Sequence, residues 1–371
     1  MAHTALFVTY AMAFPRAVVG VFLRAMRLGT ALDDCGWRTV VLHAGAVPDD
    51  PKVSQRPASV TIETVRLGLS RADADRAIRR AVEVHAPDVI VFGEGPIEAT
   101  QTLFDAACAV PVPFVMLDQY YSDWLLRPPP HMDLLLLYGL RPFWTARELR
   151  LPRHAHMLPP FIDEVTPPEA LPVPPDFAGR PWITALGFDP FVMARAIELA
   201  ANTAGEWSLV VVTAWLEAAR AQLASCGIGP ERGVVVPLQR DADLFGLIAG
   251  GRAVILANGY MQLMEALALG RPAIAIDRGV GLPDWSLDER FKPYVSIGET
   301  RDVQQARLET WMTSSPFPAA LATALEAERG GARLAAAFIE RVPASVRLSI
   351  PARLRRRRRQ RAAMPAAARR G

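Results

Sequence analysis

The chain has 371 residues, of which 51% are hydrophobic, so it is long and apolar enough to bury two cores of ordinary domain size. No apolar run reaches the roughly 20 residues that a bilayer-spanning helix needs, so we predict no transmembrane segment. The net charge of +3 is unevenly distributed. Residues 351–371 hold nine Arg and no acid, which leaves residues 1–350 with a net charge of −6.

Short apolar runs and amphipathic helices alternate through the first 140 residues. The apolar runs predict strands over 5–9, 38–43, 60–65, 89–93, 114–118 and 134–138. The spacing of apolar residues predicts helices over 19–34, 72–85 and 97–107. This alternation is typical of a parallel sheet that helices cover on both faces.

A proline-rich connection then interrupts the pattern. Six prolines lie between residues 163 and 181, and such a density makes a stiff, non-helical segment. We therefore predict an N-terminal lobe over 1–165, a linker over 166–180 and a C-terminal lobe over 181–331. A last helix over 332–350 and an Arg-rich tail over 351–371 follow. The tail has no apolar pattern and is predicted to be disordered.

The alternation restarts after the linker. Strands are predicted over 182–186, 208–213, 234–236, 254–257 and 273–276, and helices over 193–203, 216–225, 244–249, 318–328 and 333–341. The predicted fold class is α/β, with two Rossmann-like, doubly wound lobes. Ligands of such sheets bind beyond the carboxyl ends of the strands, so we expect the active site in a cleft between the lobes.

One stretch of the second lobe points to a ligand. Residues 254–257 form an apolar run that leads into Asn258 and Gly259, and a short helix with Glu265 follows. A glycine turn before a helix exposes backbone N–H groups, which together with the helix dipole favour an anion. A carboxylate one turn later can accept hydrogen bonds from a vicinal diol. Phosphate and diol together indicate a nucleotide.

The same stretch resembles the donor-binding motif of GT-B glycosyltransferases, most closely the enzyme that adds N-acetylglucosamine to form lipid II and its relatives. The matching residues are Gly259, Gln262, Glu265, Ala266, Leu267, Gly270 and Pro272. The resemblance implies that Glu265 holds the ribose and that residues 259–262, with Tyr260 and Met261 between the matched positions, face the diphosphate. It also implies that the last helix returns to the first lobe.

Other loops of the second lobe follow from the resemblance. Gly187 stands where the relatives have a glycine-rich turn that touches phosphate. Leu238 and Gln239 occupy the turn whose backbone pairs with the base. Asp277 and Arg278 follow the last strand of the motif, a position that faces the donor sugar in the relatives, and Arg278 is also the cation nearest to the diphosphate site in sequence.

The first lobe is expected to bind the acceptor and to supply a base. Val21 takes the place of the family's histidine, and valine cannot accept a proton. Arg24, three residues on, is a cation near the place where a diphosphate or carboxylate would sit. Glu94 and Asp118 follow or end predicted strands, so either acid is a candidate base. Each of these charged residues also has a purely structural interpretation, as a solvated or packing residue.

The resemblance implies a metal-independent glycosyltransferase that uses a nucleotide-diphosphate sugar, in first place a UDP-sugar, and needs no further cofactor. The acceptor is not identified by the sequence. Two alternatives stay open. The first is a GT-B scaffold without catalysis, which Val21 and Asn258 favour. The second is a sugar-nucleotide 2-epimerase, for which paired acids are not evident in the sequence.

The N-terminus lacks a basic leader segment, so the sequence predicts a cytoplasmic protein. The tail has seven Arg in the nine positions 353–361, a density suited to anionic lipid at the inner leaflet. Non-specific binding to nucleic acid and a solvated extension without a partner are the alternatives, and no specific nucleic-acid site is predicted.

Overall fold

The structure is a computed structural model of the whole chain. It describes residues 2–10, 20–47, 51–119, 132–140, 154–174, 177, 179–187, 190–237, 240–257, 260–277, 291–314 and 317–348. The chain divides into two compact units, and each is described by itself. The first comprises Met1–Gly139, Leu149–Phe161 and Gly331–Gly371, and the second comprises Leu140–Glu148 and Ile162–Gly330.

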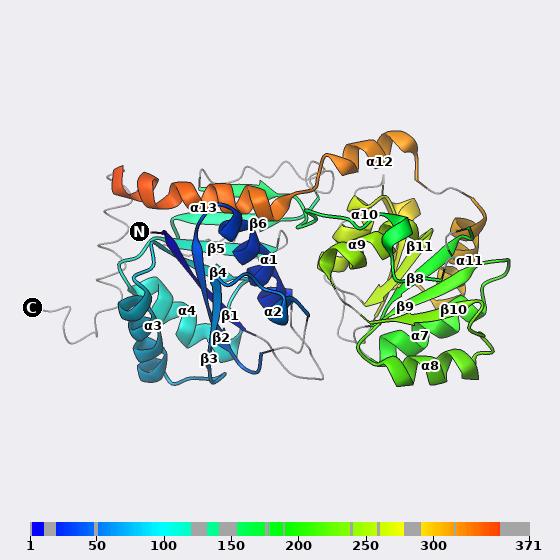
Figure 1. Ribbon diagram of the computed structural model, residues 1–371, viewed down its shortest axis with the longest axis horizontal. Coiled ribbons are helices and arrows are strands. Elements are labelled where there is room, and N and C mark those ends of the chain that lie inside the picture. Colours follow the sequence, from blue (N-terminus) through cyan, green and yellow to red (C-terminus); the bar gives the residue numbers. More distant parts are fainter. Residues whose placement is uncertain are drawn as a thin grey trace, which may run out of the picture. The chain divides into compact units, whose positions relative to one another are not determined.

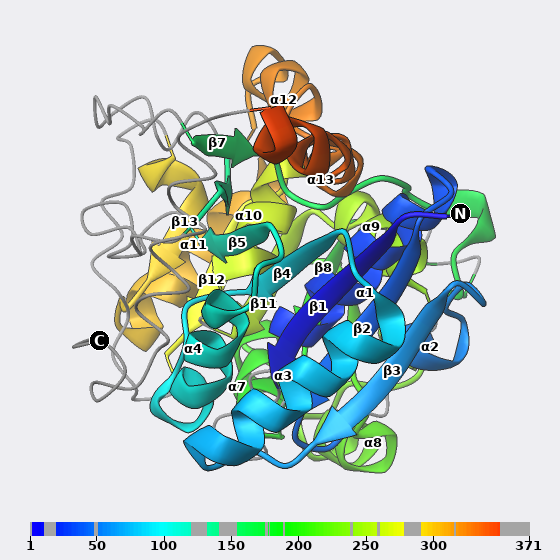
Figure 2. The same cartoon turned by 90° about the vertical axis from the view of Figure 1, so that its left-hand side faces the viewer.

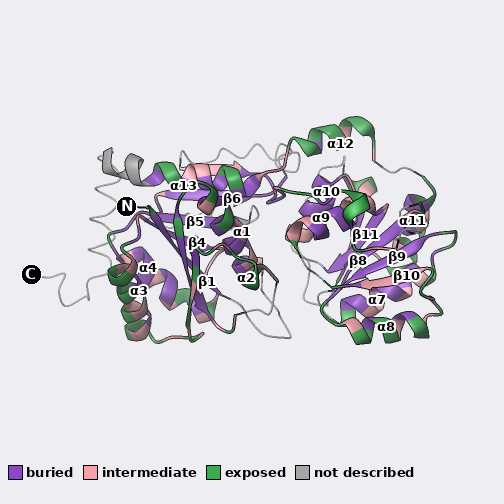
Figure 3. Ribbon diagram, viewed as in Figure 1, coloured by how far each residue is buried: buried purple, intermediate pink, exposed green. Residues whose placement is uncertain are grey.

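The described residues of the first unit form a seven-stranded parallel sheet (Figures 1 and 2). Its strands, from one edge to the other, are β3 (Val60–Val65), β2 (Arg38–Ala44), β1 (Thr4–Tyr10), β4 (Val89–Gly93), β5 (Phe114–Gln119), β6 (Leu134–Tyr138) and β7 (Ala155–Leu158). Every residue of β1, β4 and β6 is buried, because helices cover both faces of the sheet (Figure 3).

The helices of the first unit lie on the two faces of this sheet. They are α1 (Gly20–Asp34), the single turn α2 (Pro51–Ser54), α3 (Arg71–His85), α4 (Gln101–Ala109), preceded by the 3₁₀ turn η1 (Glu98–Thr100), and α13 (Gly331–Leu348). Helices α3 and α4 pack together, and α13 packs against α1 and against β4, β6 and β7. Ser70 begins α3, since its hydroxyl accepts the backbone N–H of Asp73 at 3.2 Å.

The second unit repeats the architecture in the residues that the structure describes. A parallel sheet has the order β10 (Gly233–Val236), β9 (Ser208–Val212), β8 (Trp182–Leu186), β11 (Ala253–Ala257), β12 (Ala273–Ile276) and β13 (Val295–Ile297). Its helices are α7 (Pro190–Ala201), α8 (Leu216–Ser225), α9 (Asp241–Gly250), α10 (Tyr260–Ala268), α11 (Arg301–Thr313) and α12 (Ala319–Glu326), and the 3₁₀ turns are η3 (Pro168–Ala170) and η4 (Lys292–Tyr294).

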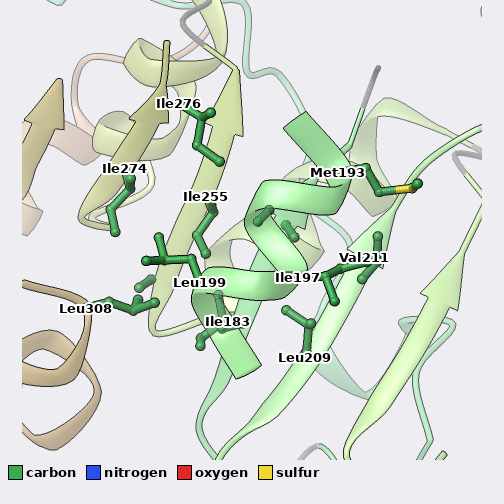
Figure 4. Packing of buried hydrophobic residues seen from close by; sticks show 14 of the residues in the cluster. Ile183, Met193, Ile197, Leu199, Leu209, Val211, Ile255, Ile274, Ile276 and Leu308 are labelled. Atoms are coloured by element: carbon green, nitrogen blue, oxygen red, sulfur yellow. The ribbon is translucent and has the colours of Figure 1, made fainter. Parts of the chain in front are cut away.

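The core of the second unit forms where α7 lies on the sheet. Ile197 and Leu199 of α7 pack against strand residues such as Ile255, and Leu308 of α11 joins the same cluster (Figure 4). In both units the chain reverses direction across the sheet after its third strand, so that β1 lies next to β4 and β8 next to β11. The predicted pair of doubly wound α/β units is confirmed.

Besides the 3₁₀ turns and the single turn α2, the elements β7, β13 and α11 escaped the sequence analysis. The two strands have four and three residues, too few to show a period. Most residues of helix α11 are polar or charged and it buries few side chains, so its apolar period is weak. Among the described helices, none combines the length and the apolarity that crossing a bilayer requires.

Candidate functional site

Polar side chains gather at the carboxyl ends of the strands of the first unit. Tyr10 ends β1, Glu94 follows β4, Asp118 lies near the end of β5 and Tyr138 ends β6. The register places Gly93 opposite Leu117, so Glu94 and Asp118 come next on neighbouring strands. Asp118 is 3% exposed and Tyr138 3% exposed, so this is a buried polar cluster and not a solvated rim.

Arg24 joins the cluster from α1. Its side chain is 2% exposed, it forms an ion pair and a hydrogen bond with the carboxylate of Glu94, and its guanidinium lies 4.4 Å from the centre of the Tyr138 ring. Burial alone lowers the pKa of Arg24, but the charges of Tyr138, Glu94 and Asp118 outweigh it and raise that pKa above its usual value. The cation is therefore permanent, and it belongs to the acid cluster.

The backbone at Glu94 is strained. Its φ is +81°, in the region that side chains other than glycine rarely adopt, and its N–H donates to the carbonyl of Leu117 at 2.5 Å. Strain of this kind persists only where the surroundings hold it, and it concentrates at functional sites. Glu94 is therefore fixed both by its backbone and by Arg24.

Tyr10 closes the cluster on the β1 side. Its hydroxyl donates to the carbonyl of Gly95 at 3.2 Å. Burial, followed by the charge of Glu94, raises the pKa of Tyr10 well above its usual value, so the phenol stays protonated at every pH that the fold tolerates. Tyr10 can donate a hydrogen bond here but cannot serve as a base.

His43 is a buried residue of this region that the sequence analysis did not single out. One ring nitrogen lies 3.0 Å from the hydroxyl of Thr9 and the other 3.0 Å from the carbonyl of Ala46, and Phe22 packs edge-on against the ring. Burial lowers the pKa of His43, so the imidazole is neutral at neutral pH. A single His at the end of a β-strand gave no motif that could have revealed it.

Val21 is a packing residue. It is fully buried, and a Cβ placed on Gly93 would lie 3.1 Å from its Cγ1, so the start of α1 sits directly against the end of β4. The position offers no group that can accept a proton. The expectation that this residue takes no part in acid–base chemistry follows from its side chain and is consistent with its place in the core.

In the second unit, the motif forms the predicted strand–helix–strand unit β11–α10–β12. Glu265 lies on the second turn of α10 and is 1% exposed, while Met261 and Gln262 are half-buried on its first turn. Gly270 ends the helical segment with a φ of +71°, which glycine adopts without strain. Asn258, Gly259 and the side chain of Tyr260 lie outside the described residues.

Gly187 lies at the junction of three strand ends. Its N–H donates to Val212 at 2.9 Å and its carbonyl accepts the hydroxyl of Thr213 at 2.6 Å. The N–H of Thr213 donates in turn to Val236. A Cβ on Gly187 would lie 2.8 Å from Cβ of Met193, so the glycine is needed for α7 to pack here. Leu238, Gln239 and Arg278 lie outside the described residues.

Asp277 is exposed and borders a pocket of about 270 Å³. The pocket lies where β12 and β13 end and where α7 and α11 begin, and its other side chains include Phe191, Arg195, Glu299 and Arg301. Phe191 is 56% exposed, so it presents an aromatic face beside hydrogen-bonding groups of both charges. The sequence analysis missed the residues of α11 here because it did not predict that helix.

The described residues contain no group of three or more His, Cys, Asp or Glu placed to hold a metal ion. In the cluster of the first unit Glu94 pairs with Arg24. At the pocket of the second unit, Arg195 pairs with the neighbouring Glu198 at 3.1 Å, and the lining residue Glu299 pairs with Arg307 at 2.7 Å.

Comparison with known proteins identifies the fold. No protein-family profile matches the chain, and no curated protein matches its sequence. Solved structures match over most of the chain. The glycosyltransferase SnogD from Streptomyces nogalater is 17% identical, with a TM-score of 0.57 over 91% of this chain and 99% of its own. The chain has the GT-B fold.

Two further GT-B structures extend the comparison. The glycosyltransferase VinC, solved in complex with dTDP, is 14% identical, with a TM-score of 0.59 over 92% of this chain and 100% of its own. A candidate UDP-N-acetylglucosamine 2-epimerase from Listeria monocytogenes is 12% identical, with a TM-score of 0.56 over 91% of this chain and 96% of its own. The GT-B likeness predicted from the motif is confirmed for the fold, which hosts both transfer and epimerisation.

Proposed function

We propose that this protein is a glycosyltransferase that moves a sugar from a nucleotide-diphosphate sugar to an acceptor that is not yet identified. The observation that carries the proposal is Glu265, a carboxylate buried on the second turn of α10 in a GT-B fold. The motif around it indicates a nucleotide, and the similar protein VinC was solved with one. In this proposal Glu265 accepts the ribose hydroxyls, and the N-terminal end of α10 faces the diphosphate.

The helix end also accounts for departure of the nucleotide. Charge builds up on the diphosphate as the glycosidic bond breaks, and backbone N–H groups at a helix N-terminus stabilise such charge without a metal ion. We therefore propose that transfer is metal-independent, so that it survives treatment with EDTA. The donor sugar is assigned to the side of Asp277, where the aromatic ring of Phe191 and the surrounding polar groups suit a polyhydroxylated ring.

The first unit supplies the base in this proposal. Asp118, which is buried near the end of β5, is the proposed base, and Glu94 forms the ion pair with Arg24. Proton transfer by a positioned carboxylate typically contributes about 10²- to 10⁴-fold in rate.

Thermal shift with a nucleotide panel tests the donor site. A nucleotide that binds only the folded protein raises its melting temperature by mass action. We expect UDP or dTDP to produce such a rise, and Glu265→Gln, which keeps the shape of the side chain, to remove it. Glu217→Ala, at an 86% exposed position on α8, is the matched control and should leave the shift intact. The absence of any nucleotide shift, or an unchanged shift in Glu265→Gln, would contradict the proposal.

A second candidate function is epimerisation of a sugar nucleotide. The structure favours it at one point, because it brings the acids Glu94 and Asp118 to neighbouring strand ends, a pairing that the sequence did not show. Inversion at a sugar carbon needs one group to remove a proton and another to return one, and two adjacent acids can share these roles. The likeness of the fold to a candidate 2-epimerase from Listeria monocytogenes leaves this alternative open.

Incubation with UDP-sugars in D₂O, without an acceptor, separates the epimerase from the other two functions. An epimerase incorporates deuterium at the inverted carbon, which proton NMR detects. A transferase leaves the ring protons in place and releases UDP only when an acceptor or water takes the sugar. A scaffold also leaves the ring protons in place, so a second incubation adds acceptor fractions. Nucleotide binding without any release of UDP there would support the non-catalytic alternative.

The Arg-rich tail extends the proposal to an acceptor at a membrane surface. An arginine near an anionic membrane surface contributes about 1 kcal/mol of attraction, and the tail has seven in nine positions. We propose that residues 351–371 bring the protein to anionic lipid at the cytoplasmic face.

A further inference from the structure

One face of α7 lines the pocket beside Asp277. Phe191, Arg195 and Leu199 are spaced by four residues, so they lie one above another on the helix. Leu199 also packs in the core of the second unit together with Ile276, so these two residues give the pocket an apolar lining (Figure 4). Phe191, on the first turn, is 56% exposed and adds an aromatic ring. Arg195 places a cation between the apolar and the aromatic part.

Helix α11 adds a second arginine to the pocket. Arg301 and Gln304 lie three residues apart on this helix, and both line the pocket. Helix α11 packs against α7, and the side-chain amide of Gln305 donates to the hydroxyl of Thr203, just after α7, at 3.0 Å. The two arginines therefore reach the pocket from two helices that hold each other in place.

Arg195 and Arg301 share one counter-ion. Oε2 of Glu198 lies 3.1 Å from a nitrogen of Arg195 and 3.8 Å from a nitrogen of Arg301. The first contact is a hydrogen bond, whereas the second is too long to be one. Since one carboxylate balances one guanidinium, the three side chains together carry a formal charge of +1. An anionic group of a ligand can therefore pair with these two arginines.

The two acids that line the pocket have different surroundings. Glu299 is balanced by Arg307 of α11, whose guanidinium meets both of its carboxylate oxygens at 2.7 Å. Asp277 follows β12 and is exposed, and its carboxylate is an acceptor that suits hydroxyl groups. The pocket thus combines a pair of cations, an aromatic ring and a hydrogen-bond acceptor.

The pocket lies one strand away from the proposed nucleotide site. Ala257, the last residue of β11, is paired with Ile276, the last residue of β12. The chain continues from β11 towards α10 and from β12 into Asp277. Neighbouring strands are about 4.8 Å apart, so a sugar joined to a diphosphate at the start of α10 is within reach of the pocket.

We infer that this pocket selects a donor sugar that carries a carboxylate, namely a hexuronic acid joined to a nucleotide diphosphate. The carboxylate binds between Arg195 and Arg301 through charge-assisted hydrogen bonds. The apolar face of the ring packs on Phe191, and its hydroxyls bond Asp277 and Gln304. A volume of about 270 Å³ suits a single sugar ring. This selectivity rests on the proposed transferase function and names the class of its donor.

Isothermal titration calorimetry with donors that differ only at C6 measures the selectivity. The pairs are UDP-glucuronate with UDP-glucose and UDP-galacturonate with UDP-galactose, or the corresponding dTDP-sugars if dTDP is the nucleotide that binds. We expect the uronate of at least one pair to bind about tenfold or more tightly, because hydrogen bonds between charged groups are stronger than those to a neutral hydroxyl. Raising the salt should narrow the difference. Equal affinities within both pairs would overturn the inference.

Substitutions at the arginines assign the selectivity to this pocket. In Arg195→Gln and in Arg301→Gln the preference for the uronate should fall, and in the double variant it should disappear, while the affinity for UDP or dTDP alone stays unchanged. Arg301→Glu should make the uronate the weaker ligand. Glu198→Gln removes the shared counter-ion and should increase the preference, an effect that loss of a merely structural ion pair does not produce.

The matched control is Arg220→Gln. Arg220 pairs with Glu217 at the same spacing of three residues on α8, and it is not among the residues that line the pocket. Its substitution should leave the preference for the uronate unchanged. An unchanged preference in the double variant of Arg195 and Arg301 would overturn the inference.

Folding of the variants does not limit the test. Arg195 and Arg301 are 38% and 45% exposed, and Arg301→Gln removes no hydrogen bond to Glu198, so this single variant decides the outcome if the double variant does not fold. A protein that binds UDP or dTDP but does not distinguish the sugars refutes the selectivity alone. A protein that binds neither nucleotide contradicts the proposed function, and the selectivity with it.

Discussion

The guanidinium of Arg24 lies over the ring of Tyr138, 4.4 Å from its centre, and this contact joins α1 to the end of β6. Both side chains are buried, so the cation–π attraction is not weakened by water. It is a contact between residues 114 positions apart, and it depends on the parallel order of the sheet.

Tyr138→Leu should therefore destabilise the first unit by about 2 kcal/mol or more, since a desolvated cation–π pair and aromatic packing are lost together. Tyr138→Phe keeps the ring and should retain most of the stability. Amide hydrogen exchange at β6 measures the first unit separately from the second. Equal protection of β6 in the wild type and in Tyr138→Leu would show that the contact contributes nothing.

Asp118→Asn should reduce sugar transfer by about 10²- to 10⁴-fold, because asparagine cannot accept the proton. Donor binding involves the second unit, so the thermal shift with UDP or dTDP should be unchanged. Asp105→Asn on α4, where the acid is bonded to Gln101, is the control and should keep full activity. Normal turnover of the Asp118→Asn variant would show that another residue is the base.

How far the sequence predicts this molecule depends on the range of the interactions involved. Strands such as β1 and β4 are continuous apolar runs, so their periodicity and the fold class were readable from the chain. Glu94 and Asp118 were predicted as candidates because strand ends face ligands. Their pairing was not, because it follows from the register of β4 on β5, which no local pattern encodes.

Arg24 shows the same limit in another way. On the sequence it was a cation near the start of a helix, and a solvated position was as good an interpretation. The side chain of Arg24 is buried in the cluster only because α1 packs on the sheet. The pocket beside Asp277 could not be predicted from the sequence for a similar reason. Residues of α11 line it, and the apolar period of that helix is weak.

Gly187→Ala should destabilise the second unit by about 1–3 kcal/mol, since the added methyl group would lie 2.8 Å from Cβ of Met193 and α7 would have to move. Gly179→Ala is the matched control, because a Cβ there meets no atom within 4 Å. Its effect should stay within about 0.5 kcal/mol. Urea unfolding followed through the resonances of β8 measures both. If the two variants unfold alike, the close approach of α7 is not limiting.

His43 should make the first unit less stable in mild acid. Burial lowers the pKa of His43 in the folded state, whereas the unfolded chain titrates near 6.5. Between these two values the unfolded state binds a proton that the folded state does not, so the free energy of unfolding falls as the pH falls below about 6.5. His43→Gln can still bond Thr9 and Ala46 and should flatten this dependence. Urea unfolding followed through β2 at several pH values checks it, and parallel pH curves for the two proteins would contradict it.

Removal of residues 351–371 should abolish binding to anionic vesicles, because it removes nine arginines and leaves a chain with a net charge of −6. Co-sedimentation with phosphatidylglycerol-containing liposomes measures the difference, and neutral phosphatidylcholine liposomes should pellet neither form. Binding should weaken as salt is raised, since exposed charges are screened beyond about 10 Å at 0.1 M. The nucleotide thermal shift of the truncated protein should be unchanged.

Equal pelleting of the full-length and truncated forms would contradict the membrane role of the tail. Preferential retention of the full-length protein on RNA or DNA at physiological salt would assign the tail to nucleic acid instead.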